Sequence, residues 1–241
     1  MTRRRFFAPP SAFNFGKHIV TLTADEARHL REVLRLKPGD EVSVFDGEGR
    51  EFRAAVVQAR RESSELELRD EIAPARPESP LRITLAVALL KGEKFDLVVQ
   101  KATELGVWKV VPLITRHADI KLRDATDAVK RVARWQRIAL EAAKQSGRAV
   151  VPEVSLPVEL QSVFSEQCLF FSERGGHEIR QIETDEVTAI IGSEGGWSDE
   201  ELEEARAAGA QIITLGGRIL RAETAAITAA ALLQHRFGDL K

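Results

Sequence analysis

Two short apolar runs, residues 187–191 and 211–215, are each followed by a glycine-bearing loop that opens into a helix-forming segment. Their length and their Ile and Val content predict buried parallel strands. We expect them to be neighbouring strands of an open α/β sheet, in which ligands bind beyond the carboxyl ends of the strands. The loops, GSEGGW (192–197) and LGGRILRAETAA (215–226), contain no GxGxxG and no GxxxxGK[ST]. A site for a dinucleotide or a nucleoside triphosphate is therefore not expected.

The whole chain from residue 81 onward alternates between strand and helix patterns. Further strands are predicted over residues 83–90, 109–113 and 168–171, and helices over residues 94–105, 127–146, 198–208 and 223–236. Ser198 and Glu201 have the spacing of a capping box, and Gly106, Gly147 and Gly209 stand where left-handed helix ends are expected. This alternation predicts a parallel sheet covered by helices on both faces.

The N-terminal part is predicted to be mostly β structure. Strands at 41–45 and 51–59 flank the turn sequence DGEG, and a third alternating run covers 66–68. Thr23 and Glu26 have capping-box spacing for one helix, which we expect to end at the Lys-Pro-Gly sequence at 37–39. These elements predict a small β-barrel of five to six strands with one helix.

A proline-rich segment separates the two parts. Residues 73–80, APARPESP, contain three prolines in eight residues and no apolar period. That composition favours an extended linker. We therefore predict a β-barrel domain over residues 1–73, a linker over 74–80 and an α/β domain over 81–241.

Composition limits the partners and the compartment. The 35 Lys and Arg oppose 37 Asp and Glu, so any nucleic-acid contact must come from local patches. Cys168, the only cysteine, lies in the apolar run CLFF and is predicted to be buried, and no Cys/His cluster has metal-ligand spacing. The longest apolar stretch, 83–90, is too short to span a bilayer, and the first ten residues lack the apolar segment of a signal peptide. We expect a cytoplasmic protein with neither membrane nor metal partners.

The two loops hold the residues that could carry chemistry. The glycines of GSEGGW allow a ligand to approach the backbone closely, and Glu194 is the one ionisable group there. In the second loop, Arg218 and Arg221 flank Ile219 and Leu220, which are too apolar for an ordinary exposed loop. A tight turn with a solvated glutamate, and two apolar residues that fill the core under the loop, are the structural alternatives.

Five motifs in this order resemble the SPOUT methyltransferases with a deep trefoil knot, and among them the RsmE-like enzymes, which methylate N3 of a uridine in 16S ribosomal RNA. They are RHLREVLRLKPGDEVSVFDGEG (28–49), KGEKFDLVVQKATELGV (91–107), EAAKQSGR (141–148), IGSEGGW (191–197) and LGGRILRAETA (215–225). Together they span nearly the whole chain. Ser193 stands where the family usually has proline, which loosens the loop without removing a reacting group.

The resemblance implies a SPOUT α/β domain in which the C-terminal segment threads through an earlier loop, and a homodimer. Three loops of such a domain wrap S-adenosyl-L-methionine, which explains the missing nucleotide fingerprints. The implied cofactor-binding residues are Phe171, Ser172, Gly192, Ser193, Glu194, Gly195, Gly196, Leu215, Gly216, Arg218, Ile219, Leu220 and Thr224. The Ala-rich last helix suits close packing, against either the sheet or a partner subunit.

The N-terminal part resembles the family's PUA-like RNA-binding barrel. Its first forty residues hold eight Lys and Arg against four Asp and Glu, and phosphate contacts from such residues position RNA without reading its sequence. The implied RNA-binding residues are Arg3, Arg4, Arg5, Arg28, His29, Arg31, Arg35, Lys91, Lys94, Gln145 and Arg148. Arg28 and Arg35 could equally solvate a helix face.

The implied reaction needs a proton to leave uracil N3, which places negative charge on the flanking carbonyl oxygens. A fixed guanidinium there would stabilise the developing anion. We predict that Arg221 does this, with Arg218 or Arg148 as candidate helpers. Glu194 is a candidate proton acceptor, although a carboxylate is a weak base toward such a nitrogen and could instead orient the loop.

Other functions stay open at this point. A knotted methyltransferase could act on a ribose 2′-hydroxyl or on a transfer-RNA guanine. A ribosome assembly factor could bind RNA with a vestigial cofactor pocket. An oxidoreductase is excluded by the missing dinucleotide fingerprint, and a serine hydrolase by the absence of GxSxG.

Overall fold

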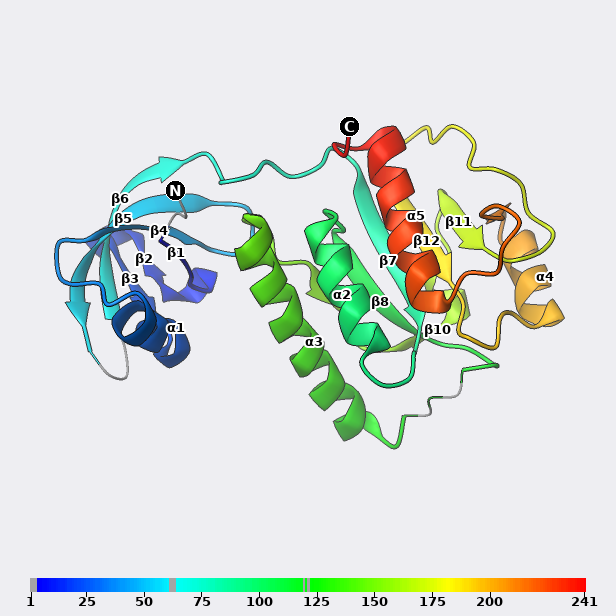
Figure 1. Cartoon of the computed structure of the whole chain (residues 1–241), viewed down its shortest axis with the longest axis horizontal. Helices are drawn as coiled ribbons and strands as arrows, with labels where there is room; N and C mark the ends of the chain where they lie inside the picture. The colour runs from blue at the N-terminus through cyan, green and yellow to red at the C-terminus, as the bar shows by residue number, and fades with distance from the viewer. Residues whose placement is uncertain (1–3, 61–63, 119, 121) are drawn as a thin grey trace. The chain divides into compact units, whose positions relative to one another are not determined.

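The computed structural model describes residues 4–60, 64–118, 120 and 122–241 (Figure 1). The chain divides into two compact units. The first runs up to Glu78 and includes Ala143–Val151, and the second holds Ser79–Ala142 and Pro152–Lys241. Each unit has its own sheet and its own hydrophobic core.

The first unit is built on a six-stranded sheet. Its strands are β1 (Arg5–Phe7), β2 (Phe13–Asn14), β3 (Ile19–Leu22), β4 (Glu41–Phe45), β5 (Glu51–Ala59) and β6 (Ser64–Ile72). They follow the order β1-β4-β5-β6-β3-β2, with β1 parallel to β4 and the other neighbours antiparallel. Phe6, Val44 and Leu66 are fully buried on the core side. This path ends at β1 and β2, so the predicted small barrel is a six-stranded half-barrel sheet.

The β4–β5 hairpin forms at the predicted turn. Asp46 Oδ1 accepts hydrogen bonds from the amides of Glu48 and Arg50, at 2.8 and 3.0 Å. Gly47 and Gly49 take positive φ angles of 83° and 114°, which explains the two glycines of DGEG. The hairpin prediction is confirmed.

The N-terminal helix differs from its prediction in two ways. Helix α1 (Ala24–Arg28) continues as a π-helical turn, η3 (His29–Val33), and the chain then turns left-handed at Arg35 (φ 54°), before the predicted stop at 37–39. The side chain of Thr23 makes no capping hydrogen bond. Glu26 is buried instead and accepts a 2.6 Å bond from Lys144 Nζ, so this predicted capping box is wrong. A buried carboxylate needs a charged partner more than a helix end needs a cap.

The second unit is a parallel sheet with helices on both faces, as predicted. The strands are β7 (Arg82–Ala88), β8 (Lys109–Ile114), β9 (Glu153–Val154), β10 (Val158–Glu159), β11 (Cys168–Phe171), β12 (Glu186–Ile191) and β13 (Gln211–Ile213). The order is β10-β8-β7-β12-β11-β13, with β9 beside β8. Strand β11 therefore lies between β12 and β13, so the expectation that those two are neighbours is wrong. The carboxyl ends of all three strands meet at one edge.

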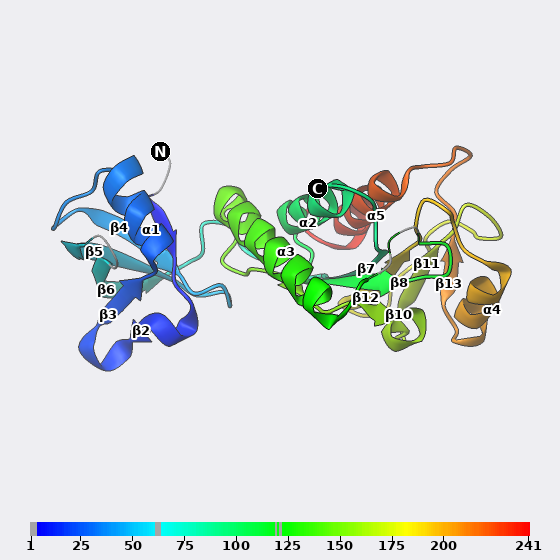
Figure 2. The same ribbon diagram turned by 90° about the horizontal axis from the view of Figure 1, so that it is seen from below.

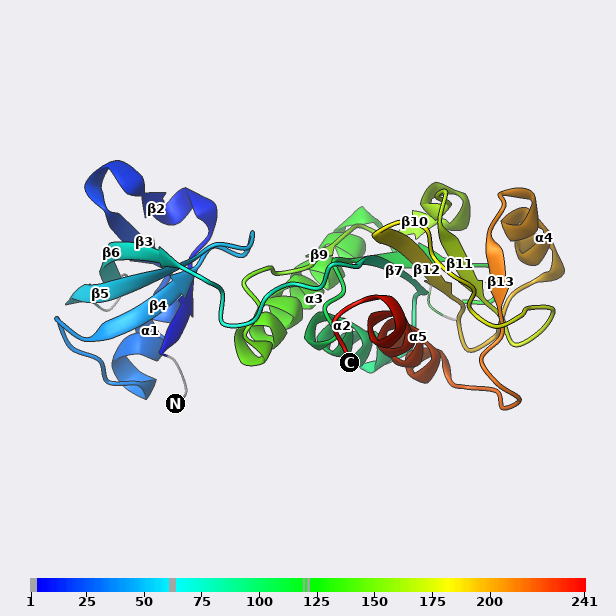
Figure 3. The same ribbon diagram turned by 90° about the horizontal axis from the view of Figure 1, so that it is seen from above.

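Helices α2 (Lys94–Glu104), α4 (Asp199–Ala207) and α5 (Ala222–Phe237) belong to this unit, as does α3 (Ala125–Ser146) up to Ala142. Helices α2 and α5 lie side by side on one face, and α4 covers the other (Figures 2 and 3). Under α4, Leu202 packs with Phe170 and Trp197 in one buried cluster.

The predicted helix ends in this part are confirmed. Ser198 Oγ accepts from the amide of Glu201, and the carboxylate of Glu201 accepts from the amide of Ser198, which is a capping box. Gly106, Gly147 and Gly209 all take positive φ angles after their helices. Cys168 is buried in β11, as predicted.

Candidate functional site

One cavity of about 470 Å³ opens at the edge where β11, β12 and β13 end. Three loops line it: residues 171–173 after β11, 191–197 after β12 and 213–222 after β13. The first turn of α5 closes the lining through Ala225. The cavity has the size of a pocket for a small organic ligand or cofactor.

Trp197 joins the first two loops. Its indole Nε1–H donates a 2.8 Å hydrogen bond to the carbonyl of Phe171, and its ring packs on Phe170 with 4.3 Å between centroids. The backbone of Gly192 passes so close that a Cβ there would lie 2.9 Å from the indole. Gly192 is therefore required by close approach to Trp197.

The 193–196 turn is held in place by one side-chain and one backbone hydrogen bond. Ser193 Oγ donates to the carbonyl of His117 at 3.0 Å, and the amide of Gly196 donates to the carbonyl of Ser193 at 3.0 Å. A Cβ at Gly195 would lie 2.8 Å from that same His117 carbonyl oxygen. Ser193 thus anchors the turn by a hydrogen bond at the position where proline would restrict the backbone.

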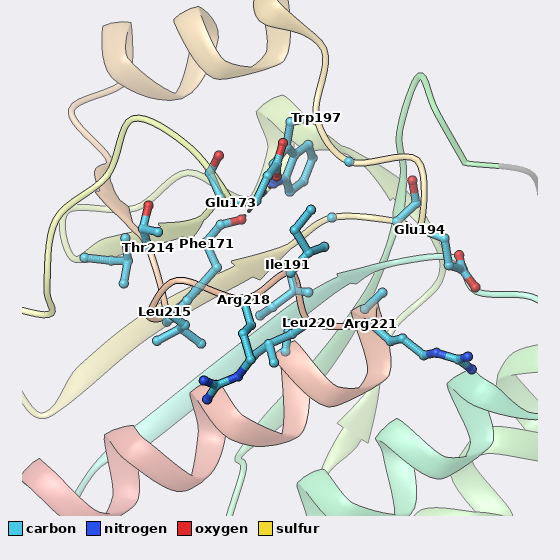
Figure 4. Close-up of a pocket in the computed structure, with 18 of the residues that line it drawn as sticks. Phe171, Glu173, Ile191, Glu194, Trp197, Thr214, Leu215, Arg218, Leu220 and Arg221 are labelled. Atoms are coloured by element: carbon cyan, nitrogen blue, oxygen red, sulfur yellow. Dashed lines mark hydrogen bonds between the residues drawn. The ribbon is translucent and has the colours of Figure 1, made fainter.

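The charged groups at the mouth of the cavity are arranged asymmetrically. Glu194 forms an ion pair with Lys94, the first residue of α2, with 2.8 Å between Glu194 Oε1 and Lys94 Nζ. The guanidinium of Arg221, at the N-cap of α5, has no hydrogen bond or ion pair with any residue that the structure describes. Figure 4 shows Arg221 and Glu194 extending to the same side of the view and Arg218 extending to the opposite side. Arg221 is thus an exposed, unpaired guanidinium beside an ion pair.

Twelve of the thirteen predicted cofactor-binding residues line this cavity, together with both predicted catalytic residues, Arg221 and Glu194. Thr224, in the first turn of α5, is the exception and does not line the cavity. Ile219 is 86% exposed although it is apolar, so the alternative in which it fills the core does not hold for it.

Residues 77–234 match the RNA methyltransferase domain family, and residues 22–69 match the RNA methyltransferase PUA domain family. The chain belongs to the RNA methyltransferase family. Its half-barrel sheet is accordingly PUA-like.

Similar proteins in this methyltransferase family include ribosomal RNA small subunit methyltransferase E of Synechocystis, 35% identical over 88% of this chain and 71% of its own. The protein of the same name from Mesomycoplasma hyopneumoniae is 33% identical over 92% of this chain and 95% of its own. The solved Neisseria gonorrhoeae enzyme of that name, bound to S-adenosylmethionine, gives a TM-score of 0.88 at 33% identity and covers 99% of this chain and 100% of its own. A Legionella pneumophila methyltransferase with bound cofactor gives 0.89 at 32% identity, covering 99% of each chain.

The residues predicted to bind RNA in this methyltransferase occupy different environments. Arg5 is buried: its guanidinium lies 3.8 Å from the Phe45 ring centroid, pairs with Glu51 at 3.2 Å and donates to the carbonyl of Arg148 at 2.7 Å. Arg148 is 4% exposed and pairs with Glu78 at 2.6 Å. These two arginines hold the first unit together.

The remaining candidates keep surface exposure. Arg4, Arg28, Arg35, Lys91 and Gln145 are exposed, and Arg31, His29 and Lys94 are half-buried. Arg28 makes an ion pair with Asp25 at 3.0 Å, and Arg31 donates to the carbonyl of Arg60 at 2.9 Å. Arg3 lies outside the described residues.

Sequence reasoning missed several cavity-lining residues, above all Glu173, Thr214 and Trp197. The Thr214 hydroxyl is buried and has no hydrogen-bond partner within the described part of the chain. Trp197 lay inside the GSEGGW motif, so its place in the loop was a usable signal. Glu173 and Thr214 belong to no motif, and only the convergence of three strand ends reveals them.

Two general features complete the description. Among the residues that the structure describes, no helix combines the length and apolar character needed to cross a membrane. Within those same ranges, no three His, Cys, Asp or Glu side chains gather as metal ligands.

Proposed function

We propose that this chain transfers the methyl group of S-adenosyl-L-methionine to N3 of a uridine in 16S ribosomal RNA. The observation that carries the proposal is the cavity formed by three strand-end loops with the unpaired Arg221 at its mouth. Relatives at 33–35% identity are named small subunit rRNA methyltransferases, and a solved one holds the cofactor.

The cavity fits the cofactor in size and in chemistry. Backbone at Gly192, Gly216 and Gly217 approaches the cavity without side chains, and Leu215 and Leu220 provide apolar walls. A buried, unpartnered Thr214 hydroxyl can bond to a ligand, because leaving it unmatched is unfavourable. All predicted cofactor residues except Thr224 keep that role, and Glu173 joins them as an acceptor for hydroxyl or amino groups.

The bound cofactor supplies an activated methyl group on a sulfonium, so the protein has to orient the base and manage one proton. Uracil N3 loses its proton as the N–C bond forms, and negative charge spreads over the flanking carbonyl oxygens. The N–H groups of Arg221 are free to donate hydrogen bonds to those carbonyl oxygens. Glu194 is the candidate acceptor of that proton, since its carboxylate lines the mouth of the cavity. The target uridine must be unpaired or flipped out, since N3 is occupied in a Watson–Crick pair.

RNA contact is assigned to the exposed basic residues of the candidate set. Arg4, Arg28, Arg31, Arg35 and Lys91 can reach phosphates, with His29 and Gln145 as polar contacts. Arg5 and Arg148 leave this set because both are buried and paired. Arg148 also leaves the list of helpers for Arg221.

The finer architecture follows the family resemblance. We assign RNA binding to residues 1–73, a linker to 74–80 and methyl transfer to 81–241, with the loop and helix after β13 threaded through a trefoil knot. Helix α5 buries Ala226, Ala229 and Ala230 against the sheet side and leaves Leu232 39% exposed, which is available to a second copy in a homodimer. The ribosomal RNA substrate places the reaction in the cytoplasm.

The test is methyl transfer from labelled S-adenosylmethionine to small ribosomal subunits that lack the modification, followed by digestion to nucleosides. Label in N3-methyluridine supports the proposal. Label in a 2′-O-methylated nucleoside or in a methylated guanosine would move the substrate and overturn the N3 assignment. Cofactor binding with no label in any nucleoside would favour the RNA-binding assembly factor.

A further inference from the structure

Two helix N-termini place two cations next to each other at the mouth of the cavity. Lys94 begins α2, and Arg221 is the N-cap of α5. Both helices follow strands of one parallel sheet and lie side by side, so both N-termini reach the same edge (Figure 1). A cation is disfavoured at a helix N-terminus, and the Arg221 side chain makes no capping hydrogen bond that would favour it there. Such a local conflict is expected where function selects the residue.

Two carboxylates accompany these cations. Glu194 accepts from Lys94 Nζ at 2.8 Å. Glu223, in the first turn of α5, has a buried Oε2 with no hydrogen-bond partner within the described residues. The pKa of Lys94 is raised first by its hydrogen bond to Glu194, and also by the charges of Glu194 and Glu223, while Arg221 opposes the rise. Lys94 therefore feels the charges of Glu194, Glu223 and Arg221.

Lys94 and Arg221 both have side chains that can form an ion pair with a carboxylate. A guanidinium is the better partner for a carboxylate, because its planar fork donates two parallel hydrogen bonds. The structure nonetheless pairs Glu194 with the lysine and leaves the arginine without an ion pair among the residues it describes. Pairing with a carboxylate would neutralise Arg221 and occupy the N–H groups that a uracil anion needs.

We propose that Lys94 is a positioning residue: by pairing with Glu194, it keeps that carboxylate from Arg221 and leaves the guanidinium available to the substrate base. The inference rests on the proposed function of Arg221. It replaces the earlier interpretation of Lys94 as an RNA contact. A phosphate contact would act on RNA affinity, whereas this role acts on the chemical step.

The experiment compares the steady-state kinetics of the full-length protein and its Lys94 variants on small ribosomal subunits. Lys94→Met is expected to lower kcat at least about tenfold at saturating RNA, which corresponds to a coupling of ordinary size between neighbouring charges. KM for the subunit stays at the wild-type value. Lys94→Arg retains the positive charge and restores most of kcat. The matched control is Lys101→Met on the same helix, whose lysine pairs with Glu104 at 2.9 Å outside the cavity and whose loss leaves kcat unchanged.

A double variant decides whether Lys94 acts through Arg221. In the Arg221→Ala background, Lys94→Met is expected to cause no further loss of kcat, because the group it keeps available is gone. Melting temperature and cofactor affinity, measured without RNA, stay at wild-type values for both Lys94 variants.

Three results would overturn the inference: an unchanged kcat in Lys94→Met, a loss confined to KM with a weaker salt dependence, or losses that add fully in the double variant. A loss confined to KM, with a weaker dependence of RNA binding on salt, would identify Lys94 as a phosphate contact. A wild-type protein that makes no N3-methyluridine would instead refute the proposed function, so the two failures are separate.

Discussion

Replacing Gly192 with alanine tests the packing that holds the cavity open. The new Cβ would lie 2.9 Å from Cε2 and 3.0 Å from Nε1 of Trp197. The indole has little room to retreat, since Trp197 is 3% exposed and packs on Phe170. Overpacking of this kind costs about 1–3 kcal/mol. A displaced indole also loses its 2.8 Å bond to the Phe171 carbonyl, which leaves two buried polar groups without a partner.

We therefore expect Gly192→Ala to lower the free energy of unfolding by about 2 kcal/mol, which in a chain of this size lowers Tm by about 4–8 °C. Cofactor affinity should weaken about tenfold, a change of about 1.4 kcal/mol, because the loops after β11 and β12 both shift. Calorimetric unfolding and titration with S-adenosylmethionine measure the two quantities.

Gly217→Ala is the matched control for this prediction. Gly217 also lines the cavity, but a Cβ there would meet no atom within 4 Å and its φ is not positive. Its Tm should stay at the wild-type value. A Gly192→Ala protein with wild-type Tm and cofactor affinity would refute the steric reasoning. Equal losses in both variants would point to lost loop flexibility as the cause.

Three further predictions concern single side chains. Arg221→Ala should lower kcat about a hundredfold with unchanged cofactor affinity, as removal of one oxyanion donor does; a rate within a few-fold of wild type in the methyl-transfer assay would remove Arg221 from the chemistry. Arg148→Met should lower the free energy of unfolding by about 3–5 kcal/mol, because it leaves Glu78 charged without its buried partner; denaturant unfolding measures this, and a small loss accompanied by weaker RNA binding would restore Arg148 to the RNA contacts. Burial raises the pKa of the Cys168 thiol to about 11, so the folded state holds this proton more tightly than the unfolded chain. Its stabilising contribution is complete below about pH 8.5 and is lost as the pH rises toward 11, by up to about 1.4 kcal/mol per pH unit; Cys168→Ala should flatten the fall in stability measured between pH 9 and pH 11.

Local patterns predicted the elements of the second unit well. Residues 168–171 form β11 with the predicted bounds, and the Ser198 cap and the three left-handed glycines appear as expected. These features depend on contacts within a few residues along the chain. The predicted capping box at Thr23 does not form, because Glu26 pairs with Lys144, a residue distant in sequence that a local pattern does not reveal.

Some cavity-lining residues could be identified from the sequence, whereas the burial of two arginines could not. The glycine loops and Arg221 were identifiable because each lies inside a motif directly after a strand. Arg5 and Arg148 looked like RNA contacts in the sequence, and the fold buries both against carboxylates. The sequence of a basic segment does not predict which of its arginines will be exposed to solvent.

By itself, the sequence determined the longer strands and the helices of the second unit, and the two glycine loops that line the cavity, since periodicity, caps and turn residues act locally. It missed the short strands β1, β2, β3, β9 and β10. The tertiary structure alone decided that β11 lies between β12 and β13, and it brings Glu173 to the cavity. It also decided that Lys94 pairs with Glu194 and leaves Arg221 exposed. Strand order and ion pairing join residues that are distant along the chain, and they are set by the packing of the whole sheet and its helices.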